Sequence, residues 1–197
     1  MLVAAIGTVA ALVIVAAAVA LTGGGDEPSD PRPALEAAGC ALTGTPALRR
    51  DHSIAKPEGT SKEWNTVPPS SGPHYGVTAI WGIYDQPANQ AQVVHNLEHG
   101  GIAIEYGDKV AAATVQQLKT FAQKKPRGTI LTPYAPLRDK VAIVAWVTPS
   151  ANEPDSGTAY IAKCTTFDEK AYEAFFDAYQ FKGPERFPSD QLLPGRQ

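Results

Sequence analysis

The stretch NQAQVVHNLEHGGIAIEY, residues 89–106, contains the two patterns from which the fold class follows. Its first part predicts a short helix that begins after Asn89, a residue type favoured just before helices, and ends at Gly100, because glycine commonly terminates them. Its last part, GIAIEY, alternates apolar residues in the manner of a strand. We therefore expect a helix that turns directly into a strand.

Further helices and strands follow downstream in mixed order, whereas the region upstream is rich in Gly and Pro and predicts little regular structure between residues 41 and 87. Two segments predict helices, residues 108–125 and 167–181, and three predict strands, residues 128–134, 141–148 and 158–164. This order does not follow a βαβ repeat, so the predicted class is α+β. We expect a single small exported domain with a mixed or antiparallel sheet packed by two to three helices, preceded by one transmembrane helix.

The N-terminal part of the chain predicts a membrane anchor. Residues 1–21 are almost entirely apolar and carry no charged side chain, and about 20 such residues in a helix span a hydrocarbon core of about 30 Å. A cleaved signal peptide is the alternative, since Ala18-Val19-Ala20 is similar to a cleavage site. The apolar run is longer than the usual signal core, however, and no basic residue precedes it, which favours an anchor.

The rest of the chain is then divided into a tether and a domain. Residues 22–36 are dominated by Gly, Pro, Asp and Ser and predict a flexible linker. Residues 37–197 are expected to form the extracytoplasmic domain. The first basic residue after the span is Arg32, beyond an acidic and Gly-rich stretch, and the absence of positive charge next to the span fits an orientation with the N-terminus inside. The predicted location is the cell membrane, with a single span and the C-terminal domain outside the cytoplasm.

Charge and cysteine content narrow the possible functions. The formal net charge is −3 and basic residues do not cluster, which argues against nucleic-acid binding because that needs a cationic surface. Cys40 and Cys164 are the only cysteines, and in an oxidising exterior such a pair predicts a disulfide. A pair of metal-binding or redox thiols is the alternative, which the absence of a CxxC spacing disfavours.

The histidines carry the strongest functional signal. His95 and His99 are four residues apart on the predicted helix, so both imidazole rings can reach one metal ion. His74, in the stiff Pro-rich stretch, would complete a three-histidine site, with His52 or Glu98 as the fourth group. Nitrogen ligands indicate Cu²⁺ or Zn²⁺ as the cofactor. The expected partners are thus a metal ion and the membrane.

Two other interpretations remain open. His95, Glu98 and His99 match the H-x-x-E-H pattern of zinc peptidases, in which two histidines bind zinc and the glutamate activates water. Glu98 would then be catalytic, with Glu169 or Glu173 as a further ligand. Because the predicted helix ends immediately after this short pattern, we expect binding rather than catalysis. The third interpretation is a metal-free envelope interaction module in which the histidines are structural.

Several phrases of the sequence match a known bacterial family. The main ones are PPSSGPHYG (68–76), WGIYDQP (81–87), VVHNLEHGGIAIEY (93–106) and FKGPERF (181–187). In content and order they resemble the family catalogued as domain of unknown function 3105, although PPSSGPH stands where PPTSGPH is usual. The resemblance runs from about Cys40 to Pro188 and implies an anchored or secreted domain. It places His74, His95, Glu98 and His99 in the signature segments and implies no particular activity.

Overall fold

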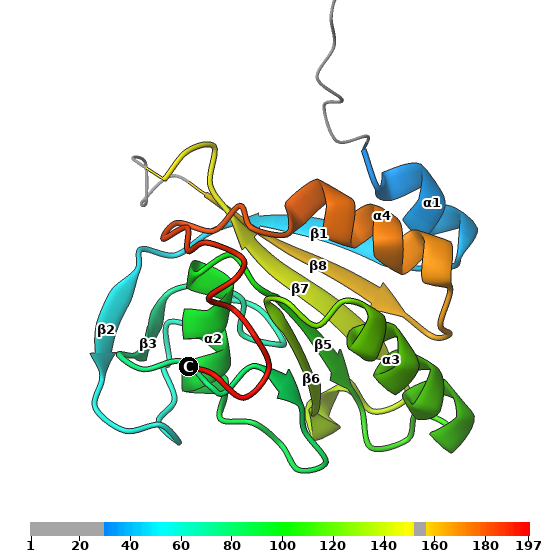
Figure 1. Ribbon diagram of the computed structural model, residues 1–197, viewed down its shortest axis with the longest axis horizontal. Helices are drawn as coiled ribbons and strands as arrows, with labels where there is room; N and C mark the ends of the chain where they lie inside the picture. The colour runs from blue at the N-terminus through cyan, green and yellow to red at the C-terminus, as the bar shows by residue number, and fades with distance from the viewer. Residues whose placement is uncertain (1–29, 152–156) are drawn as a thin grey trace, which may run out of the picture.

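A six-stranded sheet forms the centre of the protein. The computed structural model describes residues 30–151 and 157–197 (Figure 1). In spatial order the strands are β1 (Ala41–Pro46), β8 (Thr158–Cys164), β7 (Val141–Val147), β5 (Ile102–Tyr106), β6 (Thr129–Pro133) and β4 (Gly82–Ile83). The first four strands in this spatial order, β1, β8, β7 and β5, are antiparallel to their neighbours. The strand β6 is parallel to both β5 and β4. The predicted α+β class with a mixed sheet is confirmed.

Helices cover both faces of this sheet. One face is packed by α1 (Arg32–Ala37), α3 (Ala112–Lys124) and α4 (Glu169–Tyr179), and the other by α2 (Gln90–Glu98) (Figure 1). A short 3-10 helix, η1 (Ala135–Leu137), follows β6. Since successive residues of a strand point to opposite faces, β5 contributes Ile102 and Ile104 to the core under α3 and α4, and Ala103 to the core under α2.

A small second sheet encloses α2 from the other side. It consists of β2 (Asp51–Ile54) and β3 (Pro73–Tyr75), which pair in parallel, and β3 packs directly against α2. The helix is therefore enclosed between the large sheet and the small one. Its buried residues include apolar and polar side chains: Ala91, Val93, Val94, His95, Asn96, Leu97 and Glu98.

The helices and strands predicted after residue 88 are confirmed, but the region before it contains more structure than expected. Residues 41–87 were predicted to hold little regular structure, and this is wrong, because they contain β1, β2, β3 and β4. These strands have two to six residues. They bond to partners far away in the sequence, as Ala41 does opposite Lys163. Such short segments carry no long periodic pattern, so only the tertiary pairing defines them.

The number of helices also differs from the prediction, with four α-helices rather than two to three among the described residues. The additional one, α1, occupies Arg32–Ala37 and so lies largely within the predicted flexible linker. Pro31 is the N-cap and Pro33 lies in the first turn, where the missing N–H is no loss. Leu35 is fully buried in the main core, which explains why this short segment is ordered against the sheet.

The predicted transmembrane helix, residues 1–21, lies outside the described residues. Within residues 30–151 and 157–197, no helix combines the length and the apolar character needed to cross a membrane.

The predicted disulfide between Cys40 and Cys164 is confirmed. Cys40 directly precedes β1, and Cys164 ends β8, the strand with which β1 pairs. Both cysteines are buried in the core that α1, α3 and α4 share with the sheet. The bridge thus fixes the N-terminal end of the domain to its C-terminal half.

The α2 face of the sheet buries the carboxyl group of Glu105. Its Oε2 accepts a hydrogen bond of 2.8 Å from Nε2 of Gln90, and among the described residues its Oε1 has no hydrogen-bond partner. Burial raises the pKa of Glu105 to about 8, although the bond from Gln90 acts in the opposite direction. The folded protein therefore binds a proton at neutral pH that the unfolded chain releases.

Glu105→Gln is expected to stabilise the protein increasingly as the pH rises. The pKa of this carboxyl is about 8 when folded and about 4.5 otherwise, so its unfavourable effect on folding is absent below pH 4.5 and grows up to pH 8. Glutamine is always neutral, so the gain in unfolding free energy at pH 8 reaches up to roughly 4 kcal/mol, since one pKa unit is about 1.4 kcal/mol. Urea unfolding of both proteins at pH 5 and pH 8 measures it. An equal difference at the two pH values would contradict this assignment.

Candidate metal centre

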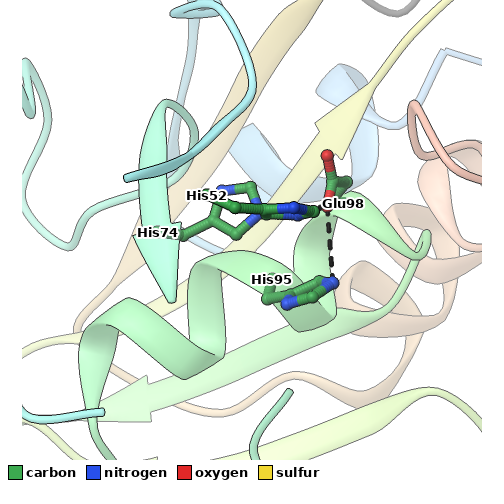
Figure 2. Close-up of side chains that lie close together, drawn as sticks. All are labelled: His52, His74, His95 and Glu98. Atoms are coloured by element: carbon green, nitrogen blue, oxygen red, sulfur yellow. Dashed lines mark hydrogen bonds and ion pairs between the residues drawn. The ribbon is translucent and has the colours of Figure 1, made fainter. Parts of the chain in front are cut away.

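Three imidazole rings and one carboxylate meet at the C-terminal part of α2 (Figure 2). His52 comes from β2, His74 from β3, and His95 and Glu98 from α2. The Nε2 atoms of His74, His52 and His95 lie 3.0, 3.2 and 3.5 Å from Oε2 of Glu98. The centroids of the three rings are 4.5–4.8 Å apart. Three separate elements therefore present four potential ligand atoms to one small volume.

Backbone carbonyl groups orient two of the three rings. Nδ1 of His74 donates to the carbonyl oxygen of Gly72 at 2.7 Å, and Nδ1 of His95 donates to that of Tyr75 at 2.8 Å. A carbonyl oxygen only accepts hydrogen bonds, so Nδ1 must carry the proton in both rings. In the form of each ring that carries only this proton, Nε2 has a free lone pair that faces Glu98. Metal-binding histidines are commonly held in this way, with the second nitrogen bonded to a carbonyl or carboxylate.

The Pro-rich loop before β3 holds His74 in place. Gly72 has a φ of +98°, which favours glycine, and a Cβ atom at this position would lie 2.8 Å from the side chain of Leu48. The Oγ atom of the buried Ser71 accepts a hydrogen bond of 3.0 Å from the backbone N–H of Leu48. The segment before β2 and the loop before β3 are thus fastened together, which brings His52 and His74 close to each other.

Polar side chains of α2 fasten the helix to the loop after β3. Asn96 accepts from the backbone N–H of Ala79 and donates to the carbonyl of the same residue, both at 2.9 Å. Gln92 donates from Nε2 to the carbonyl of Thr78 at 3.0 Å. These bonds satisfy the buried polar groups and fix the rotation of the helix about its axis. As a result, His95 and Glu98 face β3.

The two glycines after α2 allow other segments to approach the end of the helix. Gly100 has a φ of +85°, and a Cβ atom there would lie 2.9 Å from Cα of Phe181. A Cβ atom on Gly101 would lie 2.4 Å from the ring of Trp81. Any side chain at either position would therefore displace residues that surround the helix end.

The carboxylate of Glu98 is fully buried but strongly stabilised in its charged form. Burial alone raises its pKa, yet the contacts with His74 and His52, and the positive charge that His74 and His95 carry when they are protonated, together lower the pKa to about 2. Its other oxygen, Oε1, lies 3.5 Å from Nε of Arg50 and accepts no hydrogen bond within the described part of the chain. Arg50 therefore acts on Glu98 as a nearby charge.

His95 is held in its neutral form. Burial and the neighbouring His74 lower its pKa to about 4, although the bond to Tyr75 and the charge of Glu98 act to raise it. At neutral pH a carboxylate therefore faces an imidazole nitrogen whose lone pair is free. Two electron-rich atoms that face each other are well suited to hold a cation between them.

The nitrogen–oxygen distances in the cluster fit a small divalent ion, and all four potential ligand atoms lie within 4.8 Å of one another. Ligand atoms at 2.0–2.1 Å from a tetrahedral ion lie about 3.3 Å apart. The three nitrogen–oxygen distances around Glu98 are 3.0–3.5 Å, which spans that value. Three imidazole nitrogens and one carboxylate oxygen suit Zn²⁺ or Cu²⁺ better than the hard ions Mg²⁺ and Ca²⁺, which prefer oxygen ligands.

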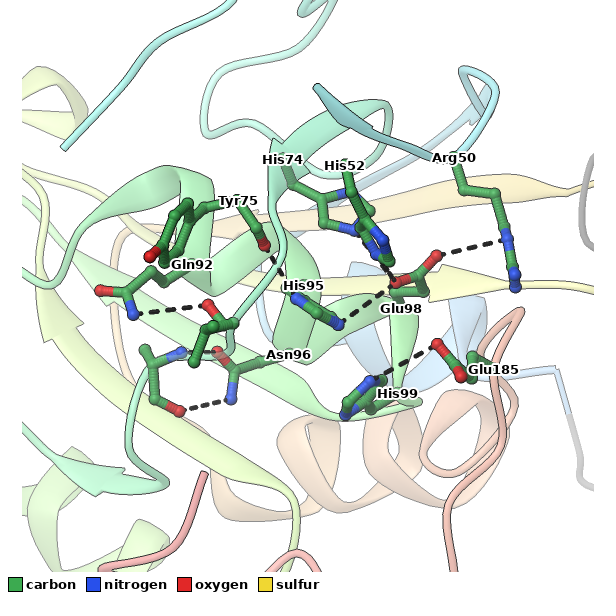
Figure 3. A network of polar contacts seen from close by, with 12 residues as sticks. Arg50, His52, His74, Tyr75, Gln92, His95, Asn96, Glu98, His99 and Glu185 are labelled. Carbon is green, nitrogen blue, oxygen red and sulfur yellow. Dashed lines mark hydrogen bonds and ion pairs between the residues drawn. The ribbon is translucent and has the colours of Figure 1, made fainter. Parts of the chain in front are cut away.

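His99 lies beside this cluster (Figure 3). Its Nε2 is 3.6 Å from Oε2 of Glu185, and its ring stacks on Phe187 with centroids 4.1 Å apart. His99 and Glu185 form a second group with His95 and Glu98, in which the potential ligand atoms lie within 4.8 Å of one another. Burial and the neighbouring His95 lower the pKa of His99 to about 4.

The predicted candidate ligands all lie in this region, but they are grouped differently from the prediction. We expected His74, His95 and His99 at the centre, with His52 or Glu98 as a fourth group. Instead, both His52 and Glu98 join His74 and His95, while His99 is next to Glu185. The difference arises because a carbonyl group holds the His95 ring towards β3, whereas the end of the helix turns His99 towards the C-terminal segment.

Two charged residues of the site were not identified from the sequence. Glu185 lies in the phrase FKGPERF, which was noted for its family resemblance, but no spacing links it to the histidines. No pattern in the sequence indicated that Arg50 would lie near the histidines. Both come next to α2 only through tertiary contacts, such as the backbone bond of 3.0 Å from Glu185 N–H to the carbonyl of Glu98.

The structure contradicts one part of the peptidase interpretation. Glu169 and Glu173, proposed as the further zinc ligand, belong to α4, which packs on the opposite face of the sheet from α2. Oε1 of Glu169 instead pairs with Nζ of Lys124 at 2.6 Å. In addition, Glu98 lies among the histidine nitrogens, the place of a ligand, whereas the H-x-x-E-H pattern needs it as a base.

Comparison with known proteins supports the family resemblance. Residues 55–191 match the model of a family described as protein of unknown function (DUF3105), and this range includes His74, His95, Glu98 and His99. Searches of curated proteins and of solved structures gave no match. Because the matched residues make up well over half of the sequence, the chain belongs to the DUF3105 family.

Proposed function

We propose that this DUF3105 protein binds a divalent transition-metal ion, Cu²⁺ or Zn²⁺, through His52, His74, His95 and Glu98. The observation that supports it most strongly is the convergence of three Nε2 atoms on one carboxylate oxygen at 3.0–3.5 Å. The carbonyl groups that hold Nδ1 of His74 and His95 add the support that metal ligands usually have. If the histidines had only a structural role, their Nε2 atoms would not need to converge on one oxygen atom.

The burial pattern favours capture or delivery of the ion over a purely structural role. Structural zinc sites are closed by four protected protein ligands. Here His74 and Glu98 are fully buried, whereas the side chain of His52 is 49 % exposed. An exposed ligand can be replaced by water or by a donor group of another molecule, which would allow the ion to exchange.

We further propose that the domain acts outside the cytoplasm, tethered by residues 1–21. The Cys40–Cys164 disulfide supports this location, because disulfides persist in oxidising compartments. In that position the domain would meet metal ions before they cross the membrane. Protease added to intact cells tests the orientation, since a domain that faces the cytoplasm would survive the treatment.

Loading the full chain with metal tests the binding proposal. The protein is purified without a histidine tag and incubated with Zn²⁺ or Cu²⁺. Its metal content is measured after unbound ions are removed, and its melting temperature is measured with free metal present. At a free concentration 100 times the Kd, binding stabilises the fold by about 2.7 kcal/mol, which raises the melting temperature by roughly 5–10 °C in a chain of this size. Mg²⁺ is the control and should cause no shift.

The opposite result would favour the metal-free interpretation. A chain that stays free of both metals after loading, with an unchanged melting temperature, would indicate that the histidines serve the fold or a protein interface.

A further inference from the structure

His99 and Glu185 continue the proposed metal centre towards the C-terminal segment. The ring of His95 contacts those of His52 and His74 on one side and that of His99 on the other, with centroids 4.6–4.8 Å apart. Figure 3 shows His99 and Glu185 across Glu98 and His95 from the other two histidines. The ligand atoms therefore form a continuous row rather than a single closed cage.

Both ends of this row are open to solvent, while its middle is buried. The side chains of His52 and Glu185 are 49 % and 40 % exposed, whereas Glu98 is fully buried and the side chain of His95 is 7 % exposed. Glu185 is held near the row by the bond from its N–H to the carbonyl of Glu98, and Phe187 fixes the ring of His99. An ion could thus leave the buried part at the end opposite His52.

Charge and ligand number favour one ion in this row at a time. His95 has a single nitrogen for a metal, because Nδ1 donates to Tyr75. Two divalent ions beside the carboxylates of Glu98 and Glu185 and the guanidinium of Arg50 would leave a net charge of +3, whereas one ion leaves +1. Excess charge in a largely buried site is strongly unfavourable.

We propose that the bound ion has two alternative positions and moves between them. The first position uses His52, His74, His95 and Glu98, and the second uses His95, Glu98, His99 and Glu185. The shared ligands allow the ion to shift without losing all its bonds at once. The first position reaches solvent only through His52, whereas two of the four ligands of the second position, His99 and Glu185, are partly exposed, so we assign loading and release mainly to the second position. This inference rests on the proposed metal binding.

The rate at which the ion leaves tests the second position. The full chain is loaded with one equivalent of Zn²⁺ and mixed with an excess of a chromophoric chelator. His99→Asn and Glu185→Gln are each expected to slow both uptake and release about tenfold, with the Kd within threefold of the original. Glu173→Gln on α4 is the matched control, since it removes a carboxylate on the opposite face of the sheet, and it should leave the rate unchanged.

The possible outcomes separate this inference from the binding proposal. Release rates within twofold of the original chain in both variants, or two Zn²⁺ ions bound per chain, would overturn the two-position mechanism while metal binding stands. An original chain that binds no metal would remove the binding proposal itself. Glu185 is partly exposed, so Glu185→Gln should fold even if His99→Asn does not.

Discussion

Replacing His74 with asparagine is expected to weaken the binding of Zn²⁺ or Cu²⁺ by the full chain about 100-fold or more. The change removes Nε2, which lies 3.0 Å from the carboxylate of Glu98. The asparagine amide can still donate to the carbonyl of Gly72, as Nδ1 of His74 does. Loss of a group that merely supports a ligand typically costs 10–100-fold in affinity, so loss of a ligand should cost at least as much. Competition with a chelator of known affinity measures the change.

Matched carboxylate variants show whether the effect belongs to the site. Glu98→Gln removes the charge at the centre of the histidines and should also weaken binding by at least 10-fold. Glu105→Gln removes another fully buried carboxyl on the same face of the sheet, but this one contacts Gln90 and none of the histidines, so the metal affinity should stay the same. If His74→Asn retained the original affinity, the four-ligand centre would be wrong.

Removing the disulfide is expected to lower the free energy of unfolding by about 4–5 kcal/mol, without effect on the metal site. The two cysteines are 124 positions apart, and the bridge therefore removes much of the entropy of the unfolded chain. In a chain of this length the loss corresponds to a fall in melting temperature of roughly 10–20 °C. The double variant Cys40→Ala/Cys164→Ala, compared by calorimetry with the original chain, measures it.

The metal affinity of the same variant is the control. Cys40 and Cys164 belong to the core on the α4 side of the sheet, whereas the histidine cluster adjoins α2 on the other side. The Kd for Zn²⁺ should therefore change less than threefold as long as the protein is folded. A fall in melting temperature of under about 3 °C would show that the bridge restrains the unfolded chain far less than the chain-entropy estimate.

Local sequence patterns were sufficient to predict the helices and strands in the second half of the fold. The helix that became α2 was predicted from Asn89 and Gly100, and the structure has them just before the helix and just after its C-cap. The strands β6, β7 and β8 follow from apolar runs that contain β-branched residues. These signals are readable because propensity and periodicity depend on neighbours within a few residues.

The first half of the fold could not be predicted in this way. The strands β2 and β3 have four and three residues, too few for a periodic pattern. These strands are held in place by side chains that form hydrogen bonds with backbone groups far away in the sequence, as Ser71 does with Leu48. Leu35 likewise orders α1 by burial against the sheet and not by a local signal. Interactions of this kind are fixed only when the whole domain packs.

The sequence by itself determined the residue types of the candidate site and the spacing of His95, Glu98 and His99 on one helix. Only the tertiary structure decided which of them face a common volume, because the direction of each ring depends on carbonyl groups from other segments, as Tyr75 directs His95. It also supplied Glu185, since a contact between parts of the chain far apart in sequence leaves no pattern in the order of residues.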